Sequence, residues 1–334
     1  MKHSYILACC TAILLAIASC KDDDSESNAD TTDTASAAPA VQTPAFNADT
    51  AYQYVAAQVA FGPRVPGTSA QKSCAAWMET RLRAFCDTVY RQSTTVTGGD
   101  KKSLPCINLV GAINPAAQRR ILLLAHWDSR PWADEDTKDQ DKPILAADDG
   151  ASGVAVLLEL ARALKGQPLP ENLGVDILFI DVEDYGRTEW GEDSYCLGTQ
   201  YWARNPHVPG YHADYGILLD MVGARAARFP MEQSSSRYAP DVQQRVWQAA
   251  STAGYSSYFP AVHSRNGVTD DHVYVNELAR IPTIDIIHLT DATRSNFPAH
   301  WHTHGDNMSV IDKNTLQAVG QTLLQVLFEA ASPV

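Results

Sequence analysis

The sequence is short of positive charge. It has 26 Lys and Arg residues against 39 Asp and Glu residues, which gives a formal net charge of −13 at pH 7. This balance argues against nucleic acid or an anionic lipid surface as the main partner, because both repel acidic proteins. The 334 residues are 45% hydrophobic, which is enough for a soluble globular domain with a substantial core.

The apolar segment at the N-terminus, residues 5–18, is too short for a membrane span. It follows Lys2 and His3, and its length fits the hydrophobic region of a signal peptide. The small residues before Cys20 resemble the lipobox of bacterial lipoproteins, in which the Cys is lipidated and becomes the mature N-terminus. An ordinary signal peptide that contains a Cys is the alternative. We expect residues 1–19 to be a lipoprotein signal peptide.

Large apolar side chains are almost absent from residues 21–46, which are rich in Asp, Ser, Thr and Ala. We therefore expect residues 20–46 to be a lipidated Cys20 followed by a disordered acidic linker. Residues 21–24, Lys-Asp-Asp-Asp, resemble the export tag of some Bacteroidetes lipoproteins, with a plain acidic linker as the alternative. The sequence predicts an exported, monomeric lipoprotein of the cell envelope, on the periplasmic side or the outer surface, which contacts the membrane only through its lipid.

Cysteine is scarce after residue 20. Four cysteines remain there: Cys74, Cys86, Cys106 and Cys196. Their spacing matches no zinc-finger pattern, so a structural zinc site is not expected. If Cys74 and Cys86 share one helix, roughly 18 Å separates them, which is too far for a disulfide. The sequence assigns no pairing.

Residues 47–334 alternate between helical and strand-like patterns, without repeats. We predict helices over 49–60, 69–85 with Ser69 as the N-cap, 150–164, 198–205, 240–253, 270–278 and 314–331. We predict strands over 88–95, 106–112, 120–125, 175–180, 215–222 and 283–288. This order predicts one α/β domain with a central, mixed, twisted sheet flanked by helices in an α/β/α sandwich.

Two carboxylates directly follow the predicted strand 175–180. The segment Asp181-Val182-Glu183-Asp184 places Glu183 and Asp184 at the strand's carboxyl end, where open α/β sheets bind ligands. Neighbouring side chains on a strand point to opposite faces, so one could ligate a metal while the other acts as a base. An ordinary acidic loop is the alternative.

Other predicted strands end in similar groups. These are His126 and Asp128, Asp220, the helix-preceding pair Asp148-Asp149, the segment Asp270-Asp271-His272, and the His-rich stretch 297–304. Each alone has an ordinary explanation, such as a helix N-cap or a polar loop. Their concurrence at several strand ends favours a zinc site, because carboxylate and imidazole suit zinc and three protein ligands leave a position open for catalysis.

Several of these segments resemble known enzymes over residues 50–330. Residues 147–153, Ala-Asp-Asp-Gly-Ala-Ser-Gly, are similar to the metal-bridging segment of secreted zinc aminopeptidases. The chain more specifically resembles the glutaminyl cyclases, the single-zinc branch, in residues 157–164 and 218–224. Asp270-Asp271-His272 and Phe297-Pro298-x-x-Trp301-His302-Thr303 discriminate best, because aminopeptidases usually lack the Trp.

The resemblance implies an activity and a set of site residues. A glutaminyl-peptide cyclotransferase converts the N-terminal glutamine of a peptide or exported protein to pyroglutamate and releases ammonia. One zinc per chain would be held by Asp149, Asp184 and His302. Catalysis would fall to Glu183 as general acid and base, with Asp220 and Asp270 nearby raising its pKa. Substrate would contact Trp301 and Phe297, with Trp190 at the rim.

Two other functions stay open, and the chain departs from the animal pattern. Because His126 and Asp220 are present, a two-zinc aminopeptidase is the first alternative, and a binding lipoprotein with an inactive enzyme fold is the second. Asp184 replaces the second Glu of the animal enzymes, and Asp285 stands where they carry a His. The insert 130–143 is expected to form a lid or rim loop.

Overall fold

The computed structural model describes residues 41–332, so the predicted signal peptide, Cys20 and most of the predicted linker lie outside the described residues. The last linker residues belong to the folded domain. The Phe46 ring is buried where a β-carbon at Gly320 would clash with it, and the Phe46 backbone N–H donates to the Gln321 side chain. The folded part therefore begins before residue 47, because Phe46 supplies apolar surface to the core. No described helix is long and apolar enough to cross a membrane.

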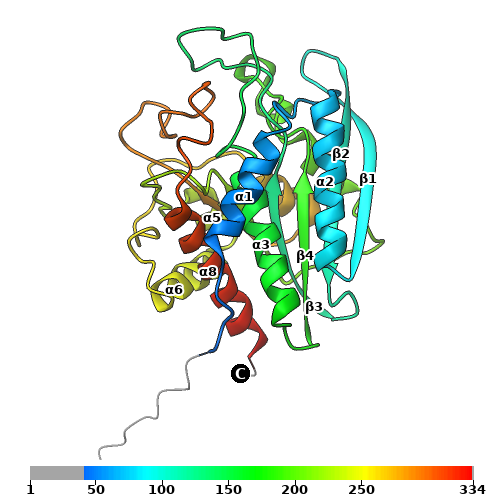
Figure 1. Cartoon of the computed structure of the whole chain (residues 1–334), viewed down its shortest axis with the longest axis vertical. Coiled ribbons are helices and arrows are strands. Elements are labelled where there is room, and N and C mark those ends of the chain that lie inside the picture. The colour runs from blue at the N-terminus through cyan, green and yellow to red at the C-terminus, as the bar shows by residue number, and fades with distance from the viewer. Residues whose placement is uncertain (1–40, 333–334) are drawn as a thin grey trace, which may run out of the picture. The chain divides into compact units, whose positions relative to one another are not determined.

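The centre of the domain is a six-stranded sheet with the strand order β1-β2-β4-β3-β5-β6. Figure 1 labels β1, β2, β3 and β4 of this sheet. Its strands are β1 (Thr88–Thr97), β2 (Ser103–Ile113), β3 (Arg119–His126), β4 (Leu173–Ile180), β5 (Tyr215–Asp220) and β6 (Thr283–Ile287). The pairs β1–β2 and β2–β4 are antiparallel, whereas β4, β3, β5 and β6 run parallel. The sheet is therefore mixed, as predicted.

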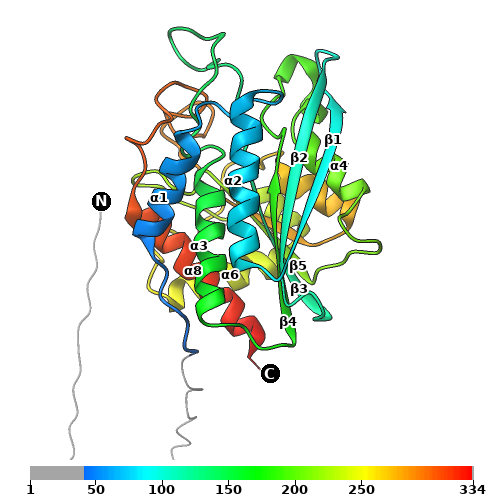
Figure 2. The same cartoon turned by 45° about the vertical axis from the view of Figure 1, so that its right-hand side comes forward.

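Helices cover both faces of the sheet, which gives the predicted α/β/α sandwich (Figure 2). Along β3, Leu123 packs into the core that contains Leu160, and the next residue, Leu124, packs into the core that contains Trp202. This alternation follows from the period of two in a strand. The first core is built by α1 (Ala48–Val59), α2 (Ser69–Phe85), α3 (Ser152–Gly166), α6 (Pro240–Thr252) and α8 (Lys313–Ala331). The second is built by α4 (Leu197–Arg204) and the turn η3 (Val275–Ala279).

The predicted elements are present, with local differences. The N-cap of α2 is Thr68, whose side chain accepts from the Gln71 N–H, and not Ser69. The predicted helix 270–278 is divided into α7 (Asp271–Tyr274) and the π-type turn η3. Strand β5 ends at Asp220 because Met221 adopts a left-handed backbone conformation with φ of 49°.

Three short helical elements were not predicted: α5 (Gln233–Tyr238), η1 (Thr188–Trp190) and η2 (Glu192–Ser194). The three serines of α5 have modest helix propensity, so tertiary contacts decide its conformation. The buried Glu232 side chain caps α5 by accepting from the Ser234 and Ser235 N–H groups. The four cysteines of the described chain are buried and unpaired.

Candidate active site

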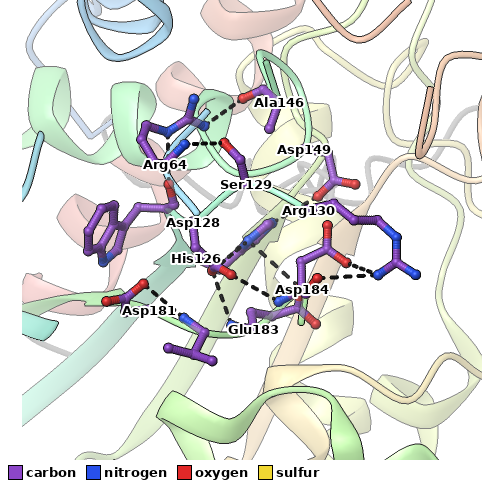
Figure 3. A network of polar contacts seen from close by, with 12 residues as sticks. Arg64, His126, Asp128, Ser129, Arg130, Ala146, Asp149, Asp181, Glu183 and Asp184 are labelled. Carbon is purple, nitrogen blue, oxygen red and sulfur yellow. Dashed lines mark hydrogen bonds and ion pairs between the residues drawn. The ribbon is translucent and has the colours of Figure 1, made fainter. Parts of the chain in front are cut away.

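The carboxyl ends of the parallel strands bring the predicted site residues together. His126 ends β3, Asp220 ends β5, and Glu183 and Asp184 follow β4. Asp149 lies just before α3, and its carboxylate lies near Asp184 and His126 (Figure 3). Segments far apart in the sequence therefore converge because parallel strands end at the same edge of a sheet.

The predicted zinc ligands form a first cluster. The Nε2 atom of His302 lies 3.3 Å from Oδ1 of Asp184 and 3.7 Å from Oδ2 of Asp149. One donor atom from each residue lies within 4.8 Å of the other two, and all three residues are buried. The Oδ2 atom of Asp184 is buried without a hydrogen-bond partner. Two carboxylates, an imidazole and an unsatisfied oxygen fit a zinc ion with an open position.

Asp149 also belongs to a second cluster, with His126 and Asp220. The Nε2 atom of His126 lies 3.0 Å from Oδ1 of Asp149 and 3.4 Å from Oδ1 of Asp220. Neither ring nitrogen of His126 makes a hydrogen bond of good geometry, although both are buried. A carboxylate shared between two clusters has the arrangement of a two-metal site.

Glu183 lies beside both clusters without belonging to either. Its Oε1 atom accepts from the Cys196 thiol at 3.3 Å, and its Oε2 atom lies 3.8 Å from Nδ1 of His126. Burial is the largest cause that raises the pKa of Glu183 well above its ordinary value, and Asp184 and Asp270 raise it further, while His126 lowers it. Burial, rather than the repulsion by Asp220 and Asp270 that we expected, is therefore the main cause.

Buried carboxylates anchor the two backbone segments that carry the acidic ligands. Asp128 accepts from the Glu183 and Asp184 N–H groups at 3.1 and 3.2 Å. Asp306 accepts from the N–H groups of Asp148 and Asp149 at 2.8 and 3.1 Å. The sequence pointed to Asp128 as a strand-end residue, whereas no pattern pointed to Asp306.

Strained backbone also gathers around the site. Val182, Met221 and His302 have φ angles of 55°, 49° and 54°, in the left-handed region that non-glycine residues rarely adopt. Each such residue costs about 1–3 kcal/mol, so the surrounding contacts must hold it in place. His302 is itself a predicted site residue, Val182 directly precedes Glu183, and Met221 directly follows Asp220.

A cavity of about 610 Å³ opens over the clusters. Its acidic wall contains Asp149, Glu183, Asp184, Asp220 and Asp270. Its apolar wall contains Phe297 and Trp301. The indole of Trp301 stacks on the His302 ring with 3.6 Å between centroids, and the Phe297 ring lies 4.5 Å from the indole.

Trp190 does not line this cavity, so its predicted place at the rim is wrong. It packs against Tyr185 and Trp132 in a separate aromatic cluster and covers Gly99, where a β-carbon would touch its ring. Trp190 lies in η1, and its ring packs against the apolar cluster that Leu104 and Cys106 of β2 form with Tyr185.

Asp285, the departure from the animal pattern, lies buried on β6 behind the cavity. Its Oδ2 atom is 4.0 Å from Nδ1 of His272, and one oxygen each of Asp270 and Asp285 lies within 4.8 Å of a His272 ring nitrogen. Burial raises the pKa of Asp285 well above its ordinary value, with Asp270 adding to the effect. The region around Asp285 therefore contains an imidazole, but it is that of His272 on α7.

The sheet order, together with a carboxylate–imidazole cluster at the ends of the parallel strands, defines a zinc-exopeptidase-like α/β protein. The chain belongs to peptidase family M28, whose family model matches residues 108–327.

Within this family, the chain is similar to several cyclases. A glutaminyl-peptide cyclotransferase of Drosophila melanogaster is 30% identical over 273 residues, which cover 76% of this chain and 73% of the relative. The enzyme of the snake Gloydius blomhoffii is 29% identical over 66% of this chain and 65% of its own length. The match thus spans just under two thirds of the snake relative.

Solved structures show the same fold. The crystal structure of Bacteroides thetaiotaomicron glutaminyl cyclase bound to N-acetylhistamine is 48% identical, with a TM-score of 0.83, over 86% of this chain and 99% of that one. A Zn-dependent exopeptidase from Parabacteroides distasonis is 47% identical, with the same TM-score and coverage. The fold is therefore confirmed, and the names of its neighbours include a glutaminyl cyclase and a zinc-dependent exopeptidase.

Proposed function

We propose that the chain is a zinc-dependent glutaminyl-peptide cyclotransferase, an acyltransferase that converts N-terminal glutamine to pyroglutamate and releases ammonia. One observation carries the proposal: Phe297 and Trp301 form an aromatic wall directly against the ligand His302, in the same cavity as Glu183. The similarity to curated and solved cyclases supports it.

Zinc would be held by Asp149, Asp184 and His302, one ion per chain. When bound, zinc supplies a Lewis acid that polarises the side-chain amide carbonyl and stabilises the negative charge developing on its oxygen. The protein provides this position inside a buried acidic cluster.

Glu183 would move the proton. The α-amino nitrogen of the substrate forms a bond to its own side-chain amide carbon, and the bond from that carbon to the amide nitrogen breaks. The Glu183 carboxylate accepts a proton from the attacking nitrogen and returns it to the leaving nitrogen, which departs as ammonia. One carboxylate performs both roles best when its pKa lies above the ordinary range, as burial provides here.

The remaining walls would bind and orient the substrate. Oδ1 of Asp220 and Oδ2 of Asp270 are buried oxygens without hydrogen-bond partners, and both residues line the cavity. They are placed to accept hydrogen bonds from the substrate's N-terminal amine. Phe297 and Trp301 would pack on the methylene groups of the glutamine, fold its side chain back towards the amine and exclude water.

The test is to count zinc and products in the purified protein. We expect one zinc per chain and release of ammonia from peptides with N-terminal glutamine, without release of free residues. Release of N-terminal residues from ordinary aminopeptidase substrates by a protein with two zincs would overturn the proposal.

The second candidate, a two-zinc aminopeptidase, is favoured by the position of Asp149 between both clusters. It predicts two zincs per chain and residue release in the same assays. A protein that binds zinc and peptides but produces neither product would be a binding module.

We further propose that the domain is displayed as a monomeric lipoprotein in the cell envelope, anchored through Cys20, with exported proteins that carry N-terminal glutamine as substrates. Cys20→Ala should abolish labelling with a fatty acid and release the protein from membranes. Unchanged membrane association would contradict this anchor.

A further inference from the structure

The insert 130–143 lies against the metal ligands and not over the cavity. None of its residues is among the described residues that line the cavity. Internal backbone hydrogen bonds close the loop, from Ile144 N–H to the Arg130 carbonyl and from Ala133 N–H to the Gln140 carbonyl. This closed, anchored loop does not fit the lid, which was one of the two roles expected for it.

Arg130, at the start of this loop, is buried and binds the ligand Asp184. Its Nη1 atom donates to Oδ1 of Asp184 at 2.7 Å and to the Asp184 carbonyl at 3.2 Å. Figure 3 shows the guanidinium directed at Asp184. Because Arg130 holds Oδ1, the unpartnered Oδ2 atom of Asp184 stays available for a cation.

Asp134 extends the contact to the second ligand. Its carboxylate accepts from Nε and Nη2 of Arg130 at 2.7 and 2.6 Å, in the bidentate geometry that fixes a guanidinium. Its Oδ1 atom also lies 3.5 Å from Nδ1 of His302. A carboxylate on this side favours the proton on Nδ1 and leaves the Nε2 lone pair towards Asp149 and Asp184.

Backbone contacts join the same loop to the segment around His302. The Glu135 N–H donates to the His302 carbonyl at 3.2 Å, and the His304 N–H donates to Asp136 at 2.8 Å. His302 has a left-handed backbone conformation, so these contacts help to keep a strained ligand in position.

We infer that the insert 130–143 is a clasp for the metal site, with Arg130 and Asp134 as positioning residues that pre-orient Asp184 and His302. The inference rests on the proposed zinc site. It also accounts for the short ligand: Asp184 lacks one methylene of the animal pattern, and Arg130 fixes its carboxylate from behind.

The test measures zinc affinity, by competition with a chelator, in Arg130→Met, Arg130→Lys and Asp134→Asn variants. Arg187→Met is the matched control. Arg187 also contacts the insert, because its guanidinium lies over the ring of Trp132. Its side chain forms an ion pair with Glu189 and none with a proposed zinc ligand. Loss of such supporting contacts typically weakens metal affinity by about 10–100-fold. We expect this loss in Arg130→Met, about 10-fold losses in Arg130→Lys and Asp134→Asn, and no change in Arg187→Met.

The visible spectrum of the cobalt-substituted protein gives an independent readout. We expect Arg130→Lys and Asp134→Asn to change the ligand-field bands, since the ligands are held less firmly. If Arg130→Met does not fold, these two conservative variants decide. Zinc affinity and spectra that match the parent in both would overturn the clasp. Failure of the parent itself to bind zinc would instead overturn the proposed function.

Discussion

The two clusters of the site contain the same kinds of atom but differ in their surroundings. Each joins Asp149 to one other Asp and one His. Burial raises the pKa of Asp184, but His302 and Arg130 outweigh it and lower the value to about 2. Burial raises the pKa of Asp220 well above its ordinary value, although His126 lowers it. The pKa of the second Asp is therefore lowered in the first cluster and raised in the second.

Because both clusters contain two Asp residues and one His, the types of ligand alone do not decide which cluster binds a metal. The buried guanidinium of Arg130 stands against the first cluster, whereas the described chain places no Arg or Lys ion pair on Asp220. Metal binding displaces the proton of a carboxyl ligand, so a lower pKa at the ligand favours the metal. The comparison predicts one zinc, in the first cluster.

The largest expected effect comes from removing one imidazole from each cluster. His302→Ala should lower zinc affinity more than the roughly 100-fold that supporting residues can cost. His126→Ala should retain one zinc per chain, because it leaves the first cluster intact. Zinc analysis after dialysis measures both. Equal zinc loss in the two variants would show that the clusters act as one site and would contradict a single zinc in the first cluster.

Glu183→Gln should lower kcat by about 10²–10⁴-fold, the usual contribution of a general acid and base. The amide cannot accept the proton, yet it is nearly isosteric and leaves the three ligands in place. Zinc content and thermal unfolding, measured beside kcat, should match the parent. Near-normal turnover would remove Glu183 from the mechanism.

Glu232 tests, away from the cavity, whether neighbouring donors keep a buried carboxyl group ionised. It is buried, and burial raises its pKa, but His272 and the N–H groups of Ser234 and Ser235 lower it to about 2. A carboxyl group whose pKa is lower in the folded state stabilises the fold above its unfolded value near 4.5, and this contribution is lost as pH falls towards 2. The shift corresponds to about 3 kcal/mol.

Urea unfolding at pH 7 and pH 3 measures this contribution. Glu232→Gln should be less stable than the parent at pH 7, and the gap should narrow at pH 3. Glu79→Gln is the control, because the Glu79 carboxylate pairs with Arg83 and Arg91 at the surface, where ion pairs contribute little. A gap that stays constant with pH would show that Glu232 acts through packing alone.

The sequence predicted the sheet, and with it the convergence of several site residues, because strand patterns follow local rules. Strand ends carry His126 and Asp220, and the chain after β4 carries Glu183 and Asp184, so a parallel sheet alone brings them together. Trp190 lies only six positions after Asp184, yet its ring packs in the aromatic cluster with Trp132 and Tyr185, which closeness in sequence did not predict.

The supporting groups could not be predicted from strand ends. Asp306 and Asp134 lie in loops, and no periodicity fixes where a loop carries its side chains. Arg130 was included only in the insert expected to be a lid or rim loop, because its contact with Asp184 spans 54 positions of sequence. Such contacts become visible only when the fold places two loops side by side.

The smallest expected effect on activity comes from removing the thiol that binds Oε1 of Glu183. The Cys196 thiol donates to Oε1 of Glu183, and a hydrogen bond of this kind contributes about 1 kcal/mol. Cys196→Ala should therefore lower kcat/KM by less than about 10-fold. Because the thiol stabilises the carboxylate, its loss should also move the acidic limb of the pH–rate profile to higher pH.

Cys106→Ala is the control, since this buried thiol contacts Asn108 and the Asp181 carbonyl and does not line the cavity. A profile that moves equally in both variants would mean that the shift reflects general loosening of the core.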